Sequence, residues 1–171
     1  KLKADGSLDC VYIPQRLDAH RLIEDFMILA NVAAAETLES LQIPLIYRVH
    51  DEPSAEKLKA FTEVLASIGV KITQQGALRP EFFNRILLKI EGSPHQAFVN
   101  DIVLRSQAQA EYSNENYGHF GLNLRKYAHF TSPIRRYADL IVHRALINGL
   151  KLGPDGLKCD TISKLPEIAA S

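Results

Sequence analysis

Apolar side chains recur every three or four residues in five segments of the chain, which is the spacing of helices with one buried face. The longest pattern runs from Asp18, a good N-cap residue, to Leu41. The other four patterns predict helices over residues 54–68, 80–91, 94–106 and 132–146. The chain is therefore expected to be rich in helices.

Shorter apolar or alternating runs lie between these segments and predict strands. They cover residues 43–49, 70–73, 107–112 and 119–124. Asp5-Gly6 predicts the turn of a further hairpin within residues 1–13. The mixture predicts an α/β (α+β) fold with a mixed sheet surrounded by helices. Because no interior linker separates two domains, one compact unit is expected.

The composition excludes several classes of protein. With 171 residues and 46% hydrophobic side chains, the chain can build a sizeable core. Its 20 basic and 20 acidic side chains cancel, so any nucleic-acid binding must be local. Cys10 and Cys159 lie far apart without CxxC spacing, which argues against a zinc site and for a reducing compartment. No apolar run could span a bilayer, so we expect a cytoplasmic protein without a membrane partner.

The segment from residue 131 to residue 146 carries the most informative polar side chains. Ser132 followed by Pro133 is typical of a helix start, because a hydroxyl group caps free N–H groups and proline suits the first helical position. Arg135 and Arg136 would then lie in the first turn, where the helix dipole favours acidic residues. Two guanidinium groups beside free backbone N–H groups predict a binding site for an anion such as phosphate.

The same region mixes basic and aromatic side chains. Residues 117–144 contain arginines and a lysine among aromatic residues, and Asp139 is the single acid there. This mixture suits the backbone and bases of a single-stranded nucleic acid. In a structural alternative, the aromatic residues belong to the core, and Asp139 pairs with Arg135 or Arg136 at helical spacing. The residues alone leave both interpretations open.

Four longer stretches of sequence are distinctive. They are DAHRLIEDFMILANVAAAE at 18–36, YRVHDEPSAEKL at 47–58, HFGLNL at 119–124 and YAHFTSPIRRYADLIVHRAL at 127–146. Together they resemble the signature of the ribonuclease II/ribonuclease R family of exoribonucleases. The resemblance covers most of the chain in the same order, which is far more than a short motif.

This resemblance implies a function and a set of site residues. Members of the family hydrolyse RNA processively from the 3′ end to nucleoside 5′-monophosphates, using water activated by Mg²⁺ on a cluster of aspartates. Matched by motif, Arg135 corresponds to the catalytic arginine that grips the scissile phosphate. Glu24 corresponds to a residue that lines the pocket for the 3′-terminal nucleotide. Ser132 and Arg136, beside Arg135, are further expected substrate-binding residues.

The metal-binding aspartates of that family have no counterpart in this chain. Residues 1–171 are therefore expected to be the C-terminal portion of an RNB catalytic domain, without the aspartate-bearing half and the oligonucleotide-binding barrels. Mg²⁺ would be a cofactor of the full-length enzyme, and this chain alone would be inactive. The alternatives are a non-catalytic module that binds single-stranded RNA and a structural fragment that binds nothing. His119, His129 and His143 are expected to be structural, since metal-activated water needs no histidine base.

Overall fold

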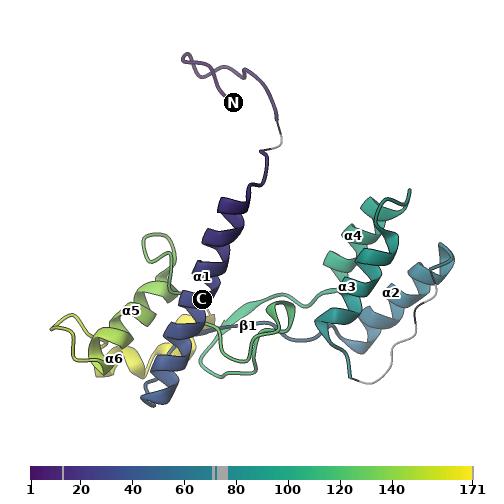
Figure 1. The fold of residues 1–171 in the computed structure, drawn as a ribbon. Coiled ribbons are helices and arrows are strands. Elements are labelled where there is room, and N and C mark those ends of the chain that lie inside the picture. Colours follow the sequence, from purple (N-terminus) through teal and green to yellow (C-terminus); the bar gives the residue numbers. More distant parts are fainter. Residues whose placement is uncertain (13, 71, 73–76, 171) are drawn as a thin grey trace.

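A computed structural model describes residues 1–171 except 13, 71, 73–76 and 171, and it is mostly helical (Figure 1). The helices are α1 (Asp18–Ser40), α2 (Ala55–Ser67), α3 (Pro80–Ile90), α4 (Gln96–Ser106), the 3₁₀ helix η1 (Phe120–Leu122), α5 (Tyr137–Gly149), α6 (Cys159–Ile162) and α7 (Leu165–Ala170). The strands are β1 (Tyr47–Val49) and β2 (Glu111–Ser113). The α/β class expected from the sequence is confirmed, with a smaller sheet than expected.

β1 has hydrogen-bonded neighbours on both of its edges. On one edge it pairs antiparallel with β2, with Tyr47 opposite Ser113. On the other edge, the His50 N–H donates to the Gly118 carbonyl oxygen at 3.0 Å, and the Phe120 N–H donates to the His50 carbonyl oxygen at 2.7 Å. This second edge brings residues 118–127 beside β1, although they contribute only isolated bridges and η1.

The buried side chains form two separate clusters. One cluster joins the second half of α1 to β1 and α5, with Leu157 and Leu165 from the C-terminal region. The other is built where α2, α3 and α4 pack on one another, around Phe61, Phe83 and Ile86. Figure 1 shows the α2–α4 group set apart from the remaining helices, with β1 between them. Each group of helices therefore encloses its own core.

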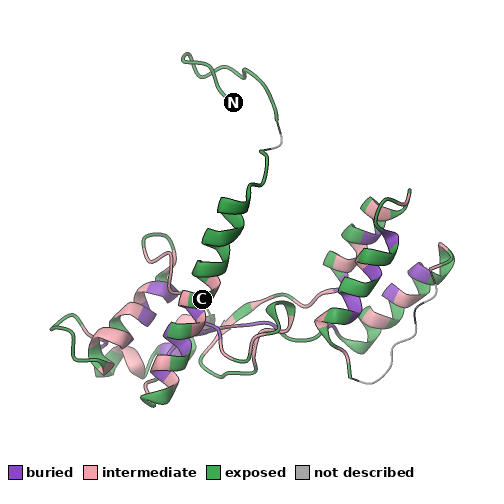
Figure 2. Ribbon diagram, viewed as in Figure 1, coloured by how far each residue is buried: buried purple, intermediate pink, exposed green. Residues whose placement is uncertain are grey.

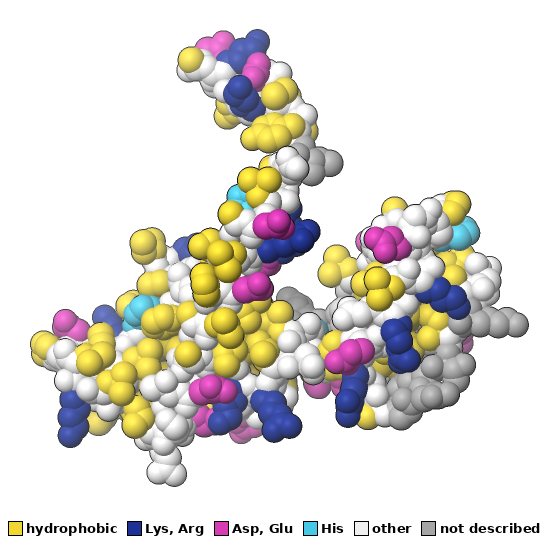
Figure 3. Space-filling model, viewed as in Figure 1, with side chains coloured by type: hydrophobic (Ala, Val, Ile, Leu, Met, Phe, Trp, Pro, Cys, Tyr) yellow, Lys and Arg dark blue, Asp and Glu magenta, His cyan; other side chains and the backbone are white. Residues whose placement is uncertain are grey.

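The long helix α1 is present as predicted, but only its second half is packed. Ala35 and Leu38 are fully buried, whereas Leu22, Phe26 and Leu29 remain 53%, 58% and 61% exposed. Figure 2 shows this division as green along the first turns of α1 and purple only further on. Figure 3 shows apolar side chains along the same helix at the molecular surface. The apolar stripe predicted the helix correctly, but its first half meets solvent.

Several predicted element boundaries can be compared with the structure. Ser54 caps α2, since its Oγ accepts a hydrogen bond from the Lys57 N–H at 3.3 Å. The helix expected to begin at Pro94 begins instead at Gln96, after a turn. The strand expected over residues 119–124 is wrong, because Asn123 adopts a left-handed conformation (φ 55°) that ends η1. The strand expected over 70–73 includes residues outside the described set.

Candidate functional site

The turn from Thr131 to Arg136 carries Arg135, the arginine that the motif resemblance matches to a catalytic residue. The N–H groups of Arg135 and Arg136 both donate to the Ser132 carbonyl oxygen, at 3.3 and 3.2 Å. The Ser132 N–H donates in turn to Asp139 Oδ1 at 2.7 Å. Since Asp139 lies in the first turn of α5, this bond joins the turn directly to the helix that follows.

Asp139 also binds the side chain of Arg136. Nε and Nη2 of Arg136 donate to Oδ2 and Oδ1 at 2.7 and 2.8 Å, which makes a bidentate pair. The Asp139 side chain is 0% exposed, so the pair neutralises a buried charge. Of the two pairings left open by the sequence, the structure contains this one. The side chain of Arg135, by contrast, is exposed and makes no hydrogen bond or ion pair with any described residue.

The helix start predicted at Ser132 is wrong. α5 begins at Tyr137, and Arg136 before it has extended backbone angles (φ −129°, ψ 118°) that separate the turn from the helix. The two arginines therefore precede the helix, and the predicted anion site on its first free N–H groups does not form. Ile134 and Tyr137, expected on the buried face, are 102% and 55% exposed. The cause is the carboxylate of Asp139, which holds the Ser132 N–H and the Arg136 side chain across this break.

Glu24 lies in the exposed half of α1. Its carboxylate forms a hydrogen-bonded ion pair with Arg16, in the segment that leads into the helix. Both side chains are more than half exposed. Within the described part of the chain, no hydrogen bond or ion pair joins Glu24 to the Thr131–Arg136 turn. The structure thus leaves both Glu24 and Arg135 accessible, on separate elements.

α1 contacts the turn through Asn31, a polar residue in the half of the helix that is packed. Asn31 Oδ1 accepts hydrogen bonds from the Phe130 N–H at 2.8 Å and the Thr131 N–H at 3.2 Å. Its Nδ2 donates to the Tyr127 hydroxyl at 2.9 Å. Asn31 is 3% exposed. One polar side chain among the small apolar residues of this helix is the signal that could have identified it.

The basic and aromatic residues of this region divide between core and surface. Lys126 forms an ion pair with Glu39 of α1, and Tyr127 is buried. Arg125 and Arg144 are exposed. The structural interpretation is therefore right for Tyr127, while the surface arginines remain available to a nucleic-acid backbone.

Three histidines beside the turn are held by hydrogen bonds. His129 Nδ1 lies 2.9 Å from the Tyr112 hydroxyl, and His143 Nε2 lies 2.8 Å from the Phe130 carbonyl oxygen. His119 Nδ1 accepts from the Leu122 N–H at 3.2 Å. These contacts agree with the structural interpretation of the three side chains.

Two of these imidazoles are uncharged at neutral pH. Burial lowers the pKa of His129 to about 4, and the positive charge of Arg136 adds to the effect. Burial also lowers the pKa of His119 to about 4, helped by the neighbouring His50, whose ring centroid is 5.0 Å away. Neither side chain therefore supplies positive charge for binding RNA.

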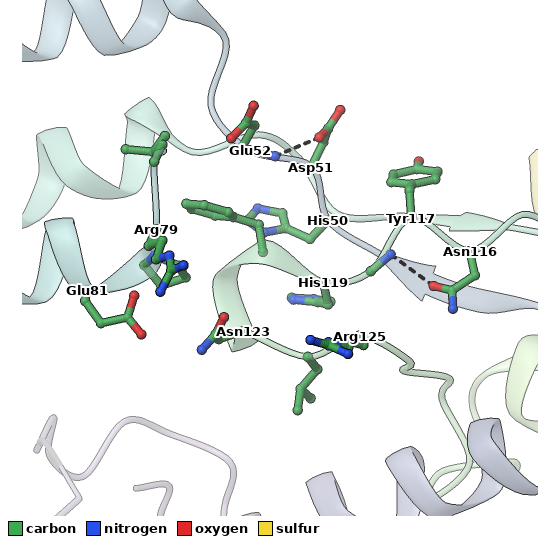
Figure 4. Close-up of a pocket in the computed structure, with 15 residues that line it drawn as sticks. His50, Asp51, Glu52, Arg79, Glu81, Asn116, Tyr117, His119, Asn123 and Arg125 are labelled. Atoms are coloured by element: carbon green, nitrogen blue, oxygen red, sulfur yellow. Dashed lines mark hydrogen bonds between the residues drawn. The ribbon is translucent and has the colours of Figure 1, made fainter. Parts of the chain in front are cut away.

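A polar cleft is lined by residues 50–52 after β1, by residues 78–81 at the start of α3 and by the segment around η1. It encloses about 760 Å³. Figure 4 shows Asp51 and Glu52 on one side of it and His119, Asn123 and Arg125 on the other. Because acidic and basic side chains both line this cleft, its charge favours no single class of ligand.

No group of three or more His, Cys, Asp or Glu side chains within the described residues could hold a metal ion. A Mg²⁺ site needs several oxygen ligands, usually including carboxylates. The residues present therefore do not fit this cofactor. Nor does any helix in the described ranges combine the length and apolarity needed to cross a membrane.

Fold and site together define a partial α/β domain that presents an exposed arginine on a turn fixed by buried polar side chains. The RNB domain family model matches residues 1–151, which is most of the chain. The chain belongs to the RNB domain family. The resemblance to the ribonuclease II/ribonuclease R family is thereby confirmed.

Curated relatives of the chain include several ribonucleases R. That of Aquifex aeolicus is 46% identical over 146 residues, which cover 85% of this chain and 21% of that protein. That of Escherichia coli is 43% identical over 143 residues, which cover 84% of this chain and 18% of that protein. The chain thus spans about a fifth of the length of these relatives.

Solved structures show the same fold. Mycoplasma genitalium RNase R in complex with ribose methylated single-stranded RNA superposes with a TM-score of 0.86 at 28% identity, over 99% of this chain and 27% of that one. The same enzyme in complex with double-stranded RNA gives a TM-score of 0.80 at 32% identity, over 89% of this chain and 28% of that one. Yeast Ssd1, a pseudonuclease, gives a TM-score of 0.74 at 24% identity, over 91% of this chain and 19% of that one. This likeness concerns the fold alone.

Proposed function

We propose that this chain is the C-terminal portion of the catalytic domain of a cytoplasmic 3′-to-5′ exoribonuclease. The complete protein, meaning this chain together with an aspartate-bearing half and oligonucleotide-binding barrels, would hydrolyse single-stranded RNA processively to nucleoside 5′-monophosphates. The RNB match over residues 1–151 carries this proposal, together with ribonuclease R relatives at 43–46% identity.

Arg135 is the proposed catalytic residue of this portion. Its guanidinium grips the scissile phosphate and stabilises the negative charge that develops there during hydrolysis. An exposed side chain without a partner in the described structure is free to make this bidentate contact. Arg136 cannot replace it, since Asp139 already holds Nε and Nη2 of that side chain.

Three further side chains, on two separate elements, are proposed to bind the substrate. Glu24 lines the pocket for the 3′-terminal nucleotide, where a carboxylate can accept hydrogen bonds from ribose hydroxyl groups. Ser132 offers a hydroxyl group that makes no hydrogen bond to the described residues. Arg136 offers Nη1, the terminal nitrogen that Asp139 does not hold.

Mg²⁺ is the proposed cofactor of the complete protein. Since the described residues include no suitable cluster of ligands, we assign its ligands to aspartates outside this chain. The bound metal would supply activated water and neutralise charge on the phosphate. This chain alone is therefore expected to be inactive.

A 5′-labelled single-stranded RNA tests this proposal. Incubated with Mg²⁺ and this chain, the RNA should persist, whereas the complete protein should shorten it stepwise from the 3′ end. Shortening by the chain alone would mean that metal ligands exist within it. If the RNA also persisted with the complete protein, the proposed exoribonuclease activity would be rejected.

A second candidate is a non-catalytic module that binds single-stranded RNA. It is favoured by the lack of a metal-ligand cluster among the described residues, combined with the exposed Arg125, Arg135 and Arg144. Such binding would weaken steeply with salt, because each phosphate contact releases a counterion. An Arg135→Glu variant of this chain with unchanged affinity for RNA would argue against this candidate.

A further inference from the structure

The tip of the turn that presents Arg135 has no buried apolar side chain, although Phe130 at its entry packs against the core and stacks on His143. Ile134, at its tip, is 102% exposed, and the Arg135 side chain is also exposed. A turn without a buried apolar side chain at its tip depends on hydrogen bonds for its conformation. The position of the Arg135 guanidinium therefore depends on the groups that hold the backbone at each end of the turn.

Two buried side chains on different helices accept the hydrogen bonds at the two ends. Asp139 of α5 holds the exit of the turn, through the Ser132 N–H and the Arg136 side chain. Asn31 of α1 holds the entry, where its Oδ1 accepts from the N–H groups of Phe130 and Thr131. Both N–H groups at the entry thus depend on one oxygen atom, on a helix about 100 residues away in sequence, while His143 of α5 contacts the Phe130 carbonyl oxygen at 2.8 Å.

From this arrangement we infer that Asn31 is a positioning residue for Arg135, and the inference rests on the proposed role of that arginine. The amide of Asn31 suits this role because it accepts with one end and donates with the other. The N–H groups of Phe130 and Thr131 can only donate, which settles the orientation of the amide: Oδ1 faces the turn, and Nδ2 donates to the Tyr127 hydroxyl. The Asn31 side chain is itself 3% exposed, so it cannot shift readily to another partner.

The loss of this oxygen would leave two partly buried backbone N–H groups without their acceptor. The turn would relax to find other partners, and Arg135 would move with it. A displacement of about 1 Å in a group that stabilises a transition state can lower turnover by about a hundredfold. RNA affinity, which is spread over many contacts, would change much less.

Two substitutions separate the oxygen from the bulk of the side chain. Asn31→Leu keeps a similar size but offers no acceptor. Asn31→Asp keeps an acceptor for the N–H groups of Phe130 and Thr131, and the Tyr127 hydroxyl can donate to it instead of accepting. Because a carboxylate that accepts several hydrogen bonds tolerates burial, Asn31→Asp serves as the conservative variant.

The first measurement is steady-state hydrolysis of single-stranded RNA by the complete protein. Asn31→Leu should lower kcat roughly tenfold to a hundredfold with KM within about twofold, and Asn31→Asp should recover most of the kcat. In an Arg135→Ala background, Asn31→Leu should cause no further loss, because the residue acts through Arg135. Ser106→Ala, which removes a buried hydroxyl in α4, is the matched control and should leave kcat unchanged.

Additive losses in the double variant, or equal losses in Asn31→Leu and Asn31→Asp, would overturn the inference. A wild-type kcat in Asn31→Leu beside an impaired Arg135→Ala would also overturn it, while leaving the proposed function intact. A wild-type kcat in Arg135→Ala would instead reject the proposed function.

Amide hydrogen exchange in this chain gives a readout that does not depend on activity. Exchange at Phe130 and Thr131 should rise about tenfold or more in Asn31→Leu and stay near wild type in Asn31→Asp. Unchanged exchange in Asn31→Leu would show that Asn31 does not hold the turn.

Discussion

Replacing Asp139 with asparagine removes the charge that holds the Arg135 turn against α5 while keeping the shape of the side chain. The carboxylate accepts three hydrogen bonds, from the Ser132 N–H and from Nε and Nη2 of Arg136, all between 2.7 and 2.8 Å. An amide cannot accept all three, because its NH₂ group would face a donor. The variant therefore loses both the ion pair and at least one hydrogen bond.

The expected loss in the free energy of unfolding follows from how deeply Asp139 and Arg136 are buried. Breaking a buried ion pair costs about 3–5 kcal/mol in the free energy of unfolding. The Asp139 side chain is 0% exposed but that of Arg136 is 21% exposed, so the arginine can regain some hydration and the lower end applies. We expect a loss of about 3 kcal/mol, or roughly 6–12 °C in Tm for a chain of this size.

Urea and thermal unfolding of this chain, followed by circular dichroism, measure this loss. Asp101→Asn is the matched control: its ion pair with Arg105 is surface-exposed, so the change should cost less than about 1 kcal/mol. Adding Arg136→Met to Asp139→Asn should restore part of the stability, because it removes the unpaired charge. An Asp139→Asn midpoint no lower than that of Asp101→Asn would refute the argument.

Three further predictions follow from other features. Because the pKa values of His119 and His129 are lowered to about 4 in the folded chain, the unfolded chain binds more protons between pH 6.5 and 4. The contribution of these two histidines to the free energy of unfolding should be fully present above about pH 6.5. Toward pH 4 it should fall by roughly 1–2 kcal/mol per histidine, after allowing for solvent screening; equal urea midpoints at pH 7 and pH 5 would contradict this. The exposed stripe on α1 should cause self-association in sedimentation experiments, which Leu22→Glu with Phe26→Glu should reduce; a chain that is monomeric at every concentration would exclude it. In the complete protein, Arg135→Ala should lower kcat by about a hundredfold or more and RNA affinity much less, and equal losses in the two would argue against a transition-state role.

Local patterns predicted most helices because their signals lie within a few residues. The stripe of α1 and the Ser54 cap of α2 are of this kind. The start of α5 was missed because Asp139 binds the Ser132 N–H and the Arg136 side chain, which favours a turn over the helix that Ser132–Pro133 would otherwise begin. The pattern of residues 119–124 predicted a strand and did not indicate that Asn123 adopts a left-handed conformation.

The candidate site was only partly predictable for the same reason. The motif resemblance indicated Arg135 and Glu24, and helical spacing allowed the pairing of Asp139 with an arginine. The role of Asn31 depends on partners 96 to 100 residues away, and no local pattern reports such contacts. Periodicity predicted the apolar face of α1 but not which part of that face the rest of the chain covers.

The uninterrupted course of α1 sets the spacing between Glu24, a proposed substrate contact, and Asn31, the proposed positioning residue for Arg135. Glu24 and Asn31 are seven residues apart on one helix, which corresponds to about 10 Å along the axis and nearly two full turns. The two side chains therefore point to almost the same side, one toward the proposed nucleotide pocket and the other toward the Arg135 turn. One residue inserted between them would rotate Glu24 by about 100° and shift it by about 1.5 Å. The length of this helical segment, as much as the identity of its residues, would thus be a requirement of the proposed site.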